Sequence, residues 1–130
     1  MASRIARHRA ERPADFTTVE EPINLASAIA SLKGRADVVV IDSLTLWVSN
    51  LMRTNDSEDA FARESEALAH RLREMDFDSV VVTDEVGGGI VPANAVARAY
   101  RDLLGLTNQR IAQAADQVLL MVAGYPLKVK

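Results

Sequence analysis

The sequence contains no cysteine, few aromatic residues and no long apolar run. The absence of cysteine excludes a disulfide framework and a thiol nucleophile, so a reducing, cytoplasmic location is the natural prediction. Aromatic residues make up 5% of the chain, which leaves little surface on which nucleic-acid bases could stack. The longest apolar run, VLLMVAG, falls far short of the roughly 20 residues that a membrane-spanning helix needs. We therefore expect neither a membrane partner nor a nucleic-acid partner.

Negative charge prevails over the whole chain, but its first residues are basic. The net charge is −3, whereas MASRIARHRAER (1–12) holds four arginines against the single acid Glu11. A basic tip on an acidic body favours a local anionic ligand over a surface built for nucleic acid. Glu11 and the lack of an apolar stretch argue against a targeting peptide. With 130 residues, 48% of them hydrophobic and 25% charged, the composition predicts one globular domain over residues 1–130.

Short β-branched runs alternate with segments of helical pattern. The predicted strands are ADVVVID (36–42), DSVVVTDE (78–85) and DQVLLMVAG (116–124). The predicted helices are 43–54, 58–75 and 94–115, the last with Gly105 as a point of interruption, and GYPLKVK (124–130) is a candidate edge strand. This alternation predicts an α/β fold with a mostly parallel sheet flanked by helices, its strands buried on both faces.

The first strand ends in an acid, Asp42. In parallel α/β sheets, ligands bind beyond the carboxyl ends of the strands. An apolar strand followed by an acid is how a P-loop NTPase presents the carboxylate that binds Mg²⁺. The equal alternative is that Asp42 caps the helix that begins near Leu44, a position that aspartate favours.

The second strand ends in the glycine-rich stretch TDEVGGGIVP (83–92). Three glycines, Gly87, Gly88 and Gly89, would let the backbone approach a ligand and offer its N–H groups to an anion. The stretch is not a Walker A loop, because no Gly-Lys-Ser/Thr follows. A mobile connection before a helix at Asn94 is an equally good interpretation. Glu85 could orient a substrate hydroxyl or simply be exposed.

A resemblance to a known family goes further than these patterns. The stretches RIARHRAERPADF, VVVIDSLTLWVSNLM and the string from VVVTDEVGGGIVP to the final GYPLKVK are similar, in order and spacing, to the bifunctional adenosylcobinamide kinase/adenosylcobinamide-phosphate guanylyltransferase family of cobalamin synthesis. The resemblance implies a P-loop NTPase fold, usually a homotrimer, with GTP, ATP and Mg²⁺ as ligands. It also implies two reactions: phosphorylation of adenosylcobinamide, and transfer of GMP from GTP to the phosphorylated product through a GMP-histidine.

The resemblance also implies site residues. The guanylylated histidine of the family corresponds to His8, and the family's GTP contacts correspond to Arg9, Ala10, Glu11, Arg12, Glu20 and Asp42. A neutral imidazole is a competent nucleophile toward phosphorus, and covalent catalysis divides one difficult displacement into two. Guanidinium groups beside it can neutralise phosphate oxygens and stabilise the charge of the transition state. The second histidine, His70, matches nothing catalytic and is expected on a helix surface.

The sequence departs from the family in one respect. The family's G-x-x-x-x-G-K-[ST] loop is absent: of Lys33, Lys128 and Lys130, only Lys33 is followed by glycine. Three explanations are open for a P-loop fold without its first strand and Walker A loop. The start of the chain is misassigned, the chain is a fragment, or a second polypeptide supplies the phosphate site. Two rival functions stay open: a catalytically impaired or non-catalytic assembly protein of the family, and a nucleic-acid-binding module that uses the basic tip.

Overall fold

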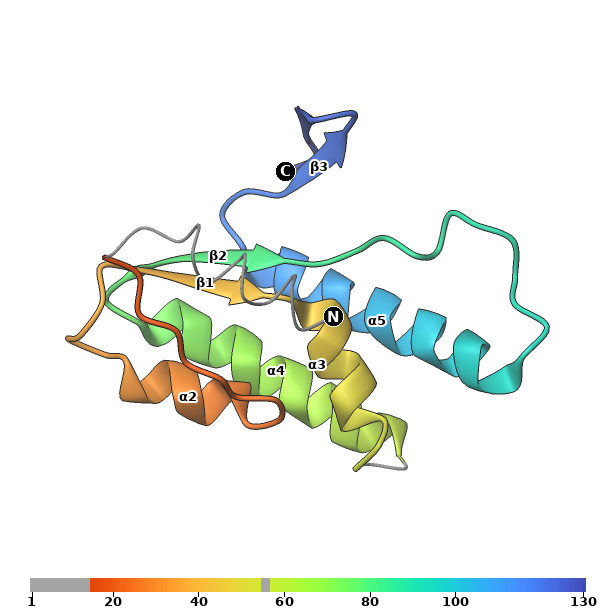
Figure 1. Cartoon of the computed structure of the whole chain (residues 1–130), viewed down its shortest axis with the longest axis horizontal. Coiled ribbons are helices and arrows are strands. Elements are labelled where there is room, and N and C mark those ends of the chain that lie inside the picture. Colours follow the sequence, from red (N-terminus) through yellow and green to blue (C-terminus); the bar gives the residue numbers. More distant parts are fainter. Residues whose placement is uncertain (1–14, 55–56) are drawn as a thin grey trace.

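The computed structural model describes residues 15–54 and 57–130, so the predictions for residues 8–12 lie outside the described residues. The elements, in chain order, are α2 (Leu25–Ser31), β1 (Val38–Asp42), α3 (Leu44–Leu51), α4 (Glu58–Glu74), β2 (Asp78–Val82), α5 (Ala95–Ala114), β3 (Leu119–Val122) and β4 (Tyr125–Lys128) (Figure 1). The three predicted helices are confirmed, and the short α2 was not predicted. Among the described residues, no helix combines the length and apolarity needed to span a membrane.

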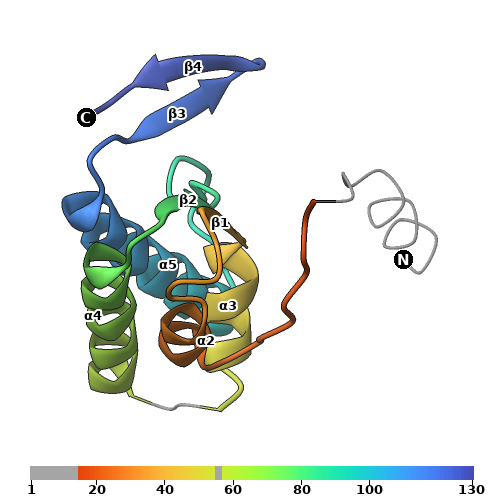
Figure 2. The same ribbon diagram turned by 90° about the vertical axis from the view of Figure 1, so that its left-hand side faces the viewer.

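Strands β1 and β2 pair in parallel, as predicted, with Val40 opposite Val80. The helices lie against one face of this pair (Figures 1 and 2). Alternate strand residues such as Ile41 and Val81 face the helices, while Val40 and Val80 are about half exposed on the other face. The prediction that these strands are buried on both faces is therefore wrong: the helices of residues 15–54 and 57–130 cover one face alone.

The predicted third parallel strand is also wrong. Residues 119–122 form β3, which pairs antiparallel with β4 in a separate two-stranded sheet, with Leu120 opposite Leu127. Ala123 and Gly124, between the strands, both have positive φ, at 50° and 83°. Two such residues favour a tight hairpin turn whose twist matches the strands it joins, and this local turn explains the pairing. Figure 2 shows the hairpin set apart from the helices and from β1 and β2.

Helix α5 runs unbroken through Gly105, so the expected interruption is absent from it. The side chain of Asn94 caps its first turn by accepting hydrogen bonds from the N–H groups of Val96 (2.8 Å) and Ala97 (3.2 Å). Such a cap satisfies donors that have no partner inside the helix. The start predicted at Asn94 is thus confirmed.

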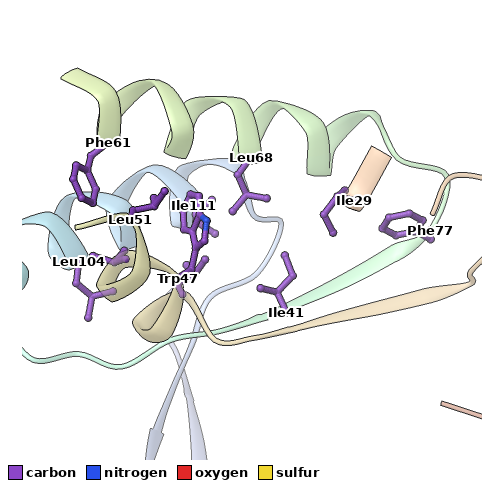
Figure 3. Close-up of a cluster of buried hydrophobic side chains, with 11 residues drawn as sticks. Ile29, Ile41, Trp47, Leu51, Phe61, Leu68, Phe77, Leu104 and Ile111 are labelled. Carbon is purple, nitrogen blue, oxygen red and sulfur yellow. The ribbon is translucent and has the colours of Figure 1, made fainter. Parts of the chain in front are cut away.

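The hydrophobic core lies between the helices and the inner face of β1 (Figure 3). Leu44 and Val48 of α3, Leu68 of α4 and Leu104 of α5 are fully buried. Trp47 is buried among them, and its indole N–H donates to the carbonyl of Ile23 at 2.7 Å. A buried indole N–H needs such a partner. Because Ile23 precedes α2 and Trp47 belongs to α3, the bond also links the segment before α2 to α3. The core thereby fixes α3 and α5 beside the carboxyl ends of β1 and β2.

Candidate functional site

The parallel register brings the ends of β1 and β2 together, with Asp42 opposite Val82. Asp42 is exposed, and the described part of the chain gives its carboxylate no hydrogen-bond or ion-pair partner. Helix α3 does begin at Leu44, but its N-cap residue is Ser43 rather than Asp42. The capping alternative for Asp42 is therefore wrong, and Asp42 is an exposed residue at the end of β1.

A closed pair of hydrogen bonds joins α3 to the segment after β2. The hydroxyl of Thr45 donates to Oδ2 of Asp84 at 2.8 Å, and the N–H of Asp84 donates back to the Thr45 hydroxyl at 3.2 Å. The hydroxyl of Tyr100, on α5, donates to the carbonyl of Thr45 at 3.1 Å. Burial, and to a smaller extent the negative charge of Asp84, raise the pKa of Tyr100 above its ordinary value. The phenol therefore keeps its proton at neutral pH and serves as a hydrogen-bond donor to Thr45.

A second set of contacts, from Asn108 of α5, holds the same segment. Its side-chain oxygen accepts a hydrogen bond from the Thr83 hydroxyl at 2.7 Å. Its Nδ2 donates to the carbonyl of Asp84 at 3.1 Å and to Oε1 of Glu85 at 2.9 Å. One buried amide thus contacts three consecutive residues, and it fixes Glu85 beside the strand ends.

Two arginines of α5 hold the two ends of the glycine-rich loop. Arg101 donates to the carbonyl of Gly87, and Arg98 donates to the carbonyls of Pro92 (2.9 Å) and Ala93 (2.6 Å). Between these points Ile90 is 97% exposed. The connection is therefore held at both ends, which the interpretation as a mobile connection before the helix at Asn94 did not anticipate.

The three loop glycines are not required by packing within the described residues. A Cβ at Gly87, Gly88 or Gly89 would meet no atom within 4 Å, and none of them has the positive φ that favours glycine. The described residues leave the space above this backbone open. A close approach by a ligand would supply the missing reason for glycine, so that role stays a prediction.

Glu20 lies in the exposed segment that precedes α2, and none of the contacts given above for the strand ends involves it. His8, Arg9, Ala10, Glu11 and Arg12 lie outside the described residues. His70 is on the surface of α4, where its Nε2 lies 3.3 Å from Glu74. Of the predicted site residues, Asp42 ends β1, whereas Glu85 and the three glycines follow β2.

Asp42 offers the chemistry of a magnesium ligand. Mg²⁺ keeps several waters and is commonly held by one or two carboxylates plus substrate phosphates, so a single free carboxylate is sufficient from the protein. Within residues 15–54 and 57–130, no group of three or more His, Cys, Asp or Glu is placed to hold a metal ion. Asp42 therefore fits Mg²⁺ that arrives with a nucleotide, and the described residues form no all-protein metal cage.

An open pocket of about 460 Å³ lies between the end of α3 and the start of α5. Its lining residues are Ser49, Met52, Arg53, Asn94, Val96, Ala97 and Tyr100. Tyr100 connects the pocket to the strand ends, because it lines the pocket and also donates to Thr45. Sequence patterns did not indicate this pocket, which depends on how α3 packs against α5.

The sequence analysis did not predict four residues that contact one another here: Thr45, Asp84, Tyr100 and Asn108. A signal existed for two of them. Tyr100, Leu104 and Asn108 are spaced by four, so they lie on one face of a helix. Polar residues on either side of a leucine on the buried face of a helix indicate side chains that form hydrogen bonds with neighbouring elements. Nothing in the sequence indicated that Thr45 pairs with Asp84.

A parallel strand pair packed against helices defines an α/β protein, and acidic residues and a glycine-rich stretch follow the carboxyl ends of its strands. Comparison with known proteins is more specific: residues 1–129 match the family model described as cobinamide kinase / cobinamide phosphate guanyltransferase. The chain belongs to this family, as its resemblance indicated.

Three relatives support the same conclusion. The bifunctional adenosylcobalamin biosynthesis protein CobP of Pseudomonas aeruginosa is 38% identical over 130 residues, which cover all of this chain and 75% of the relative. The proteins of that description named CobU, from Salmonella typhimurium and Escherichia coli, are 37% and 35% identical over 142 residues. Those alignments cover all of this chain and 78% of each relative.

Proposed function

We propose that this protein phosphorylates adenosylcobinamide with a nucleoside triphosphate, ATP or GTP, and transfers GMP from GTP to adenosylcobinamide phosphate. The observation that carries the proposal is the family match over residues 1–129, which includes the histidine stretch as well as both strand ends. The acids and the loop beyond the carboxyl ends of β1 and β2 support it, because nucleotide sites of α/β proteins lie at this edge. We place the activity in the cytoplasm and, by the same resemblance, in a homotrimer with a P-loop NTPase fold.

In the proposed guanylyl transfer, His8 is the nucleophile. A ring nitrogen of His8 attacks the α-phosphorus of GTP, the bond from that phosphorus to the bridging oxygen breaks, and pyrophosphate leaves. A phosphate oxygen of adenosylcobinamide phosphate then attacks the same phosphorus, which breaks the N–P bond and frees His8. Arg9 and Arg12 neutralise phosphate oxygens during both displacements. Ala10, Glu11 and Glu20 complete the GTP contacts implied by the family.

In the proposed kinase step, Glu85 orients the hydroxyl of the substrate. That hydroxyl attacks the terminal phosphorus of the triphosphate, the nucleoside diphosphate leaves, and Glu85 accepts the hydroxyl proton. The exposed carboxylate of Asp42 would hold Mg²⁺, which neutralises phosphate charge, and the glycine loop gives room for the substrate to approach. The carboxylate of Glu85 is already held by Asn108 at a hydrogen-bond distance of 2.9 Å, which supports an orienting role.

Replacing Glu85 tests the kinase role directly. Glu85→Gln keeps the size of the side chain and removes its ability to accept a proton, so phosphorylation of adenosylcobinamide is expected to fall by about 100-fold or more. Glu66→Gln, an exposed glutamate on α4, is the matched control and is expected to leave the rate unchanged. Phosphorylation at the parent rate in Glu85→Gln would remove Glu85 from the reaction.

A second candidate is a family protein that assembles without catalysis. One observation favours it: Val38, Val40, Val80 and Val82 form an exposed apolar face on β1 and β2. Such a face is more usual at an interface than on a solvated monomer. Assembly without GTP binding would favour this candidate, whereas GMP transfer that depends on His8 would exclude it.

A further inference from the structure

Asn108 is a buried amide whose hydrogen-bonding groups all serve the segment Thr83–Glu85. The residue is 8% exposed, in the interior of α5. Its orientation is fixed by chemistry: the carbonyl of Asp84 can only accept, so the amide nitrogen must face Asp84 and the oxygen must face Thr83. The second hydrogen of the amide nitrogen then meets Oε1 of Glu85. Burying an amide without hydrogen-bond partners costs free energy. The residues that follow β2 supply the partners of Asn108.

We propose that Asn108 is a positioning residue that sets the direction of the Glu85 carboxylate in the kinase step. The inference rests on the proposed function, because it needs Glu85 to face a substrate hydroxyl. Glu85 is exposed, and a free glutamate in such a place samples many rotamers. The bond from Asn108 holds Oε1 and leaves Oε2 to accept from the substrate.

Helix α5 holds the backbone of Asn108 in a fixed position. The helix spans 20 residues, and Leu104 and Ile111 on either side of Asn108 are in the core. The neighbouring Thr107 is also buried, and its hydroxyl lies 3.2 Å from that of Ser65 on α4. A rigid support of this kind makes orientation effective, since a displacement of about 1 Å can cost about 100-fold in rate.

The test compares Asn108→Ala with Thr107→Val in the full chain. Both changes remove a buried polar group from the same turn of α5, but only Asn108 contacts the strand end. We expect Asn108→Ala to lower kcat for adenosylcobinamide phosphorylation by about 10- to 100-fold with little change in KM for the nucleotide. Guanylylation of His8 should keep its rate. Thr107→Val should lower Tm without changing kcat. Equal loss of both reactions in Asn108→Ala, or an unchanged kcat, would overturn the proposal.

A double-mutant cycle separates this proposal from the role of Glu85 itself. If Asn108 acts through Glu85, Asn108→Ala causes no further loss of kcat in a Glu85→Gln background. If Glu85→Gln alone keeps the parent rate, the proposed role of Glu85 fails. A further fall on adding Asn108→Ala overturns the positioning role even where the role of Glu85 stands.

Stability provides a measurement that needs no activity. Asn108→Asp sets a second carboxylate against Glu85 and should lower Tm, because like charges replace a hydrogen bond. Adding Glu85→Gln restores a donor–acceptor pair in reversed order, so the double variant should recover part of the lost Tm. If the two Tm changes are simply additive, Asn108 does not hold Glu85 in solution and the proposal is overturned.

Discussion

At the scale of single residues, Tyr100 connects the pocket to the strand-end acids. Tyr100 lines the pocket, and its hydroxyl donates to the carbonyl of Thr45. The negative charge of Asp84 contributes to the raised pKa of Tyr100. Deprotonation would place a negative charge beside Asp84 and would break the donated bond. The raised pKa of Tyr100 therefore reports the geometry of the site, and it can be measured without substrate.

The titration of Tyr100 is the prediction at this scale. In a Tyr125→Phe variant, Tyr100 is the remaining tyrosine, and its absorbance should change at a pH above the ordinary pKa of about 10. Adding Asp84→Asn should lower the pKa of Tyr100 only in part, because burial is the larger cause. Asp102→Asn, an exposed acid on the same helix, is the control and should leave the midpoint in place.

The sign of the pH dependence follows from the direction of this shift. A tyrosine whose pKa is raised by folding binds its proton more tightly in the folded state. Its contribution to the free energy of unfolding is complete below the ordinary pKa and is lost as the pH rises through the raised value. A midpoint at the ordinary value, unchanged by Asp84→Asn, would contradict the placement of Tyr100 against Asp84.

The positions of Asp42 and Glu85 after their strands were easier to predict than the hydrogen bonds around the strand ends. Asp42 and Glu85 could be placed because each follows an apolar β-branched run, and such runs end at the same edge of a parallel sheet. The roles of Thr45 and Asn108 depend on contacts between residues 39 and 23 positions apart along the chain, to Asp84 and Glu85. No local pattern encodes such contacts, so only the three-dimensional structure reveals them.

At the scale of elements, the C-terminal residue secures the end of α5. The ammonium group of Lys130 donates to the carbonyls of Ala112 (3.1 Å), Gln113 (3.2 Å) and Ala115 (2.6 Å). These carbonyls lack partners within the helix, and the C-terminal end of a helix carries partial negative charge. The same residue's backbone pairs with Val118, so the cap also holds the hairpin near α5.

Removal of this cap should destabilise the fold. Lys130→Met keeps the length of the side chain and loses its charge, and it should lower the free energy of unfolding by about 1 kcal/mol. Lys128→Met is the matched control, since Lys128 lies on β4 and is exposed. Urea denaturation of both variants provides the measurement. Equal small effects in the two variants would show that the cap contributes nothing.

Helices were easier to predict than the order of strands. Helices α4 and α5 begin and end within a few residues of the predicted ranges, because apolar spacing and the N-cap residues Ser57 and Asn94 are local signals. Helix α2 (Leu25–Ser31) was missed, since seven residues carry too little pattern. The predicted third parallel strand failed because strand pairing is decided by the turn at Ala123 and Gly124, which was not considered.

At the scale of the whole molecule, the helices, β1 and β2 form one unit around the buried core, and the β3–β4 hairpin lies beside it (Figure 2). The exposed side chains of β3 are apolar. The face of β1 and β2 that is turned away from the helices is apolar as well. The family resemblance covered this whole chain and is confirmed by the match over residues 1–129. The resemblance thus predicted the family correctly, whereas strand patterns alone overestimated the size of the parallel sheet.

The measurement that tests the proposed function most directly is covalent labelling of His8. The full chain is incubated with Mg²⁺ and GTP labelled in the α-phosphate, then denatured, and the label is located by peptide mass analysis. We expect GMP on His8, no label in His8→Ala, and full label in His70→Ala. An added pool of adenosylcobinamide phosphate should remove the label as GMP is transferred. Absence of any adduct, or an adduct that persists in His8→Ala, would contradict guanylyl transfer through His8.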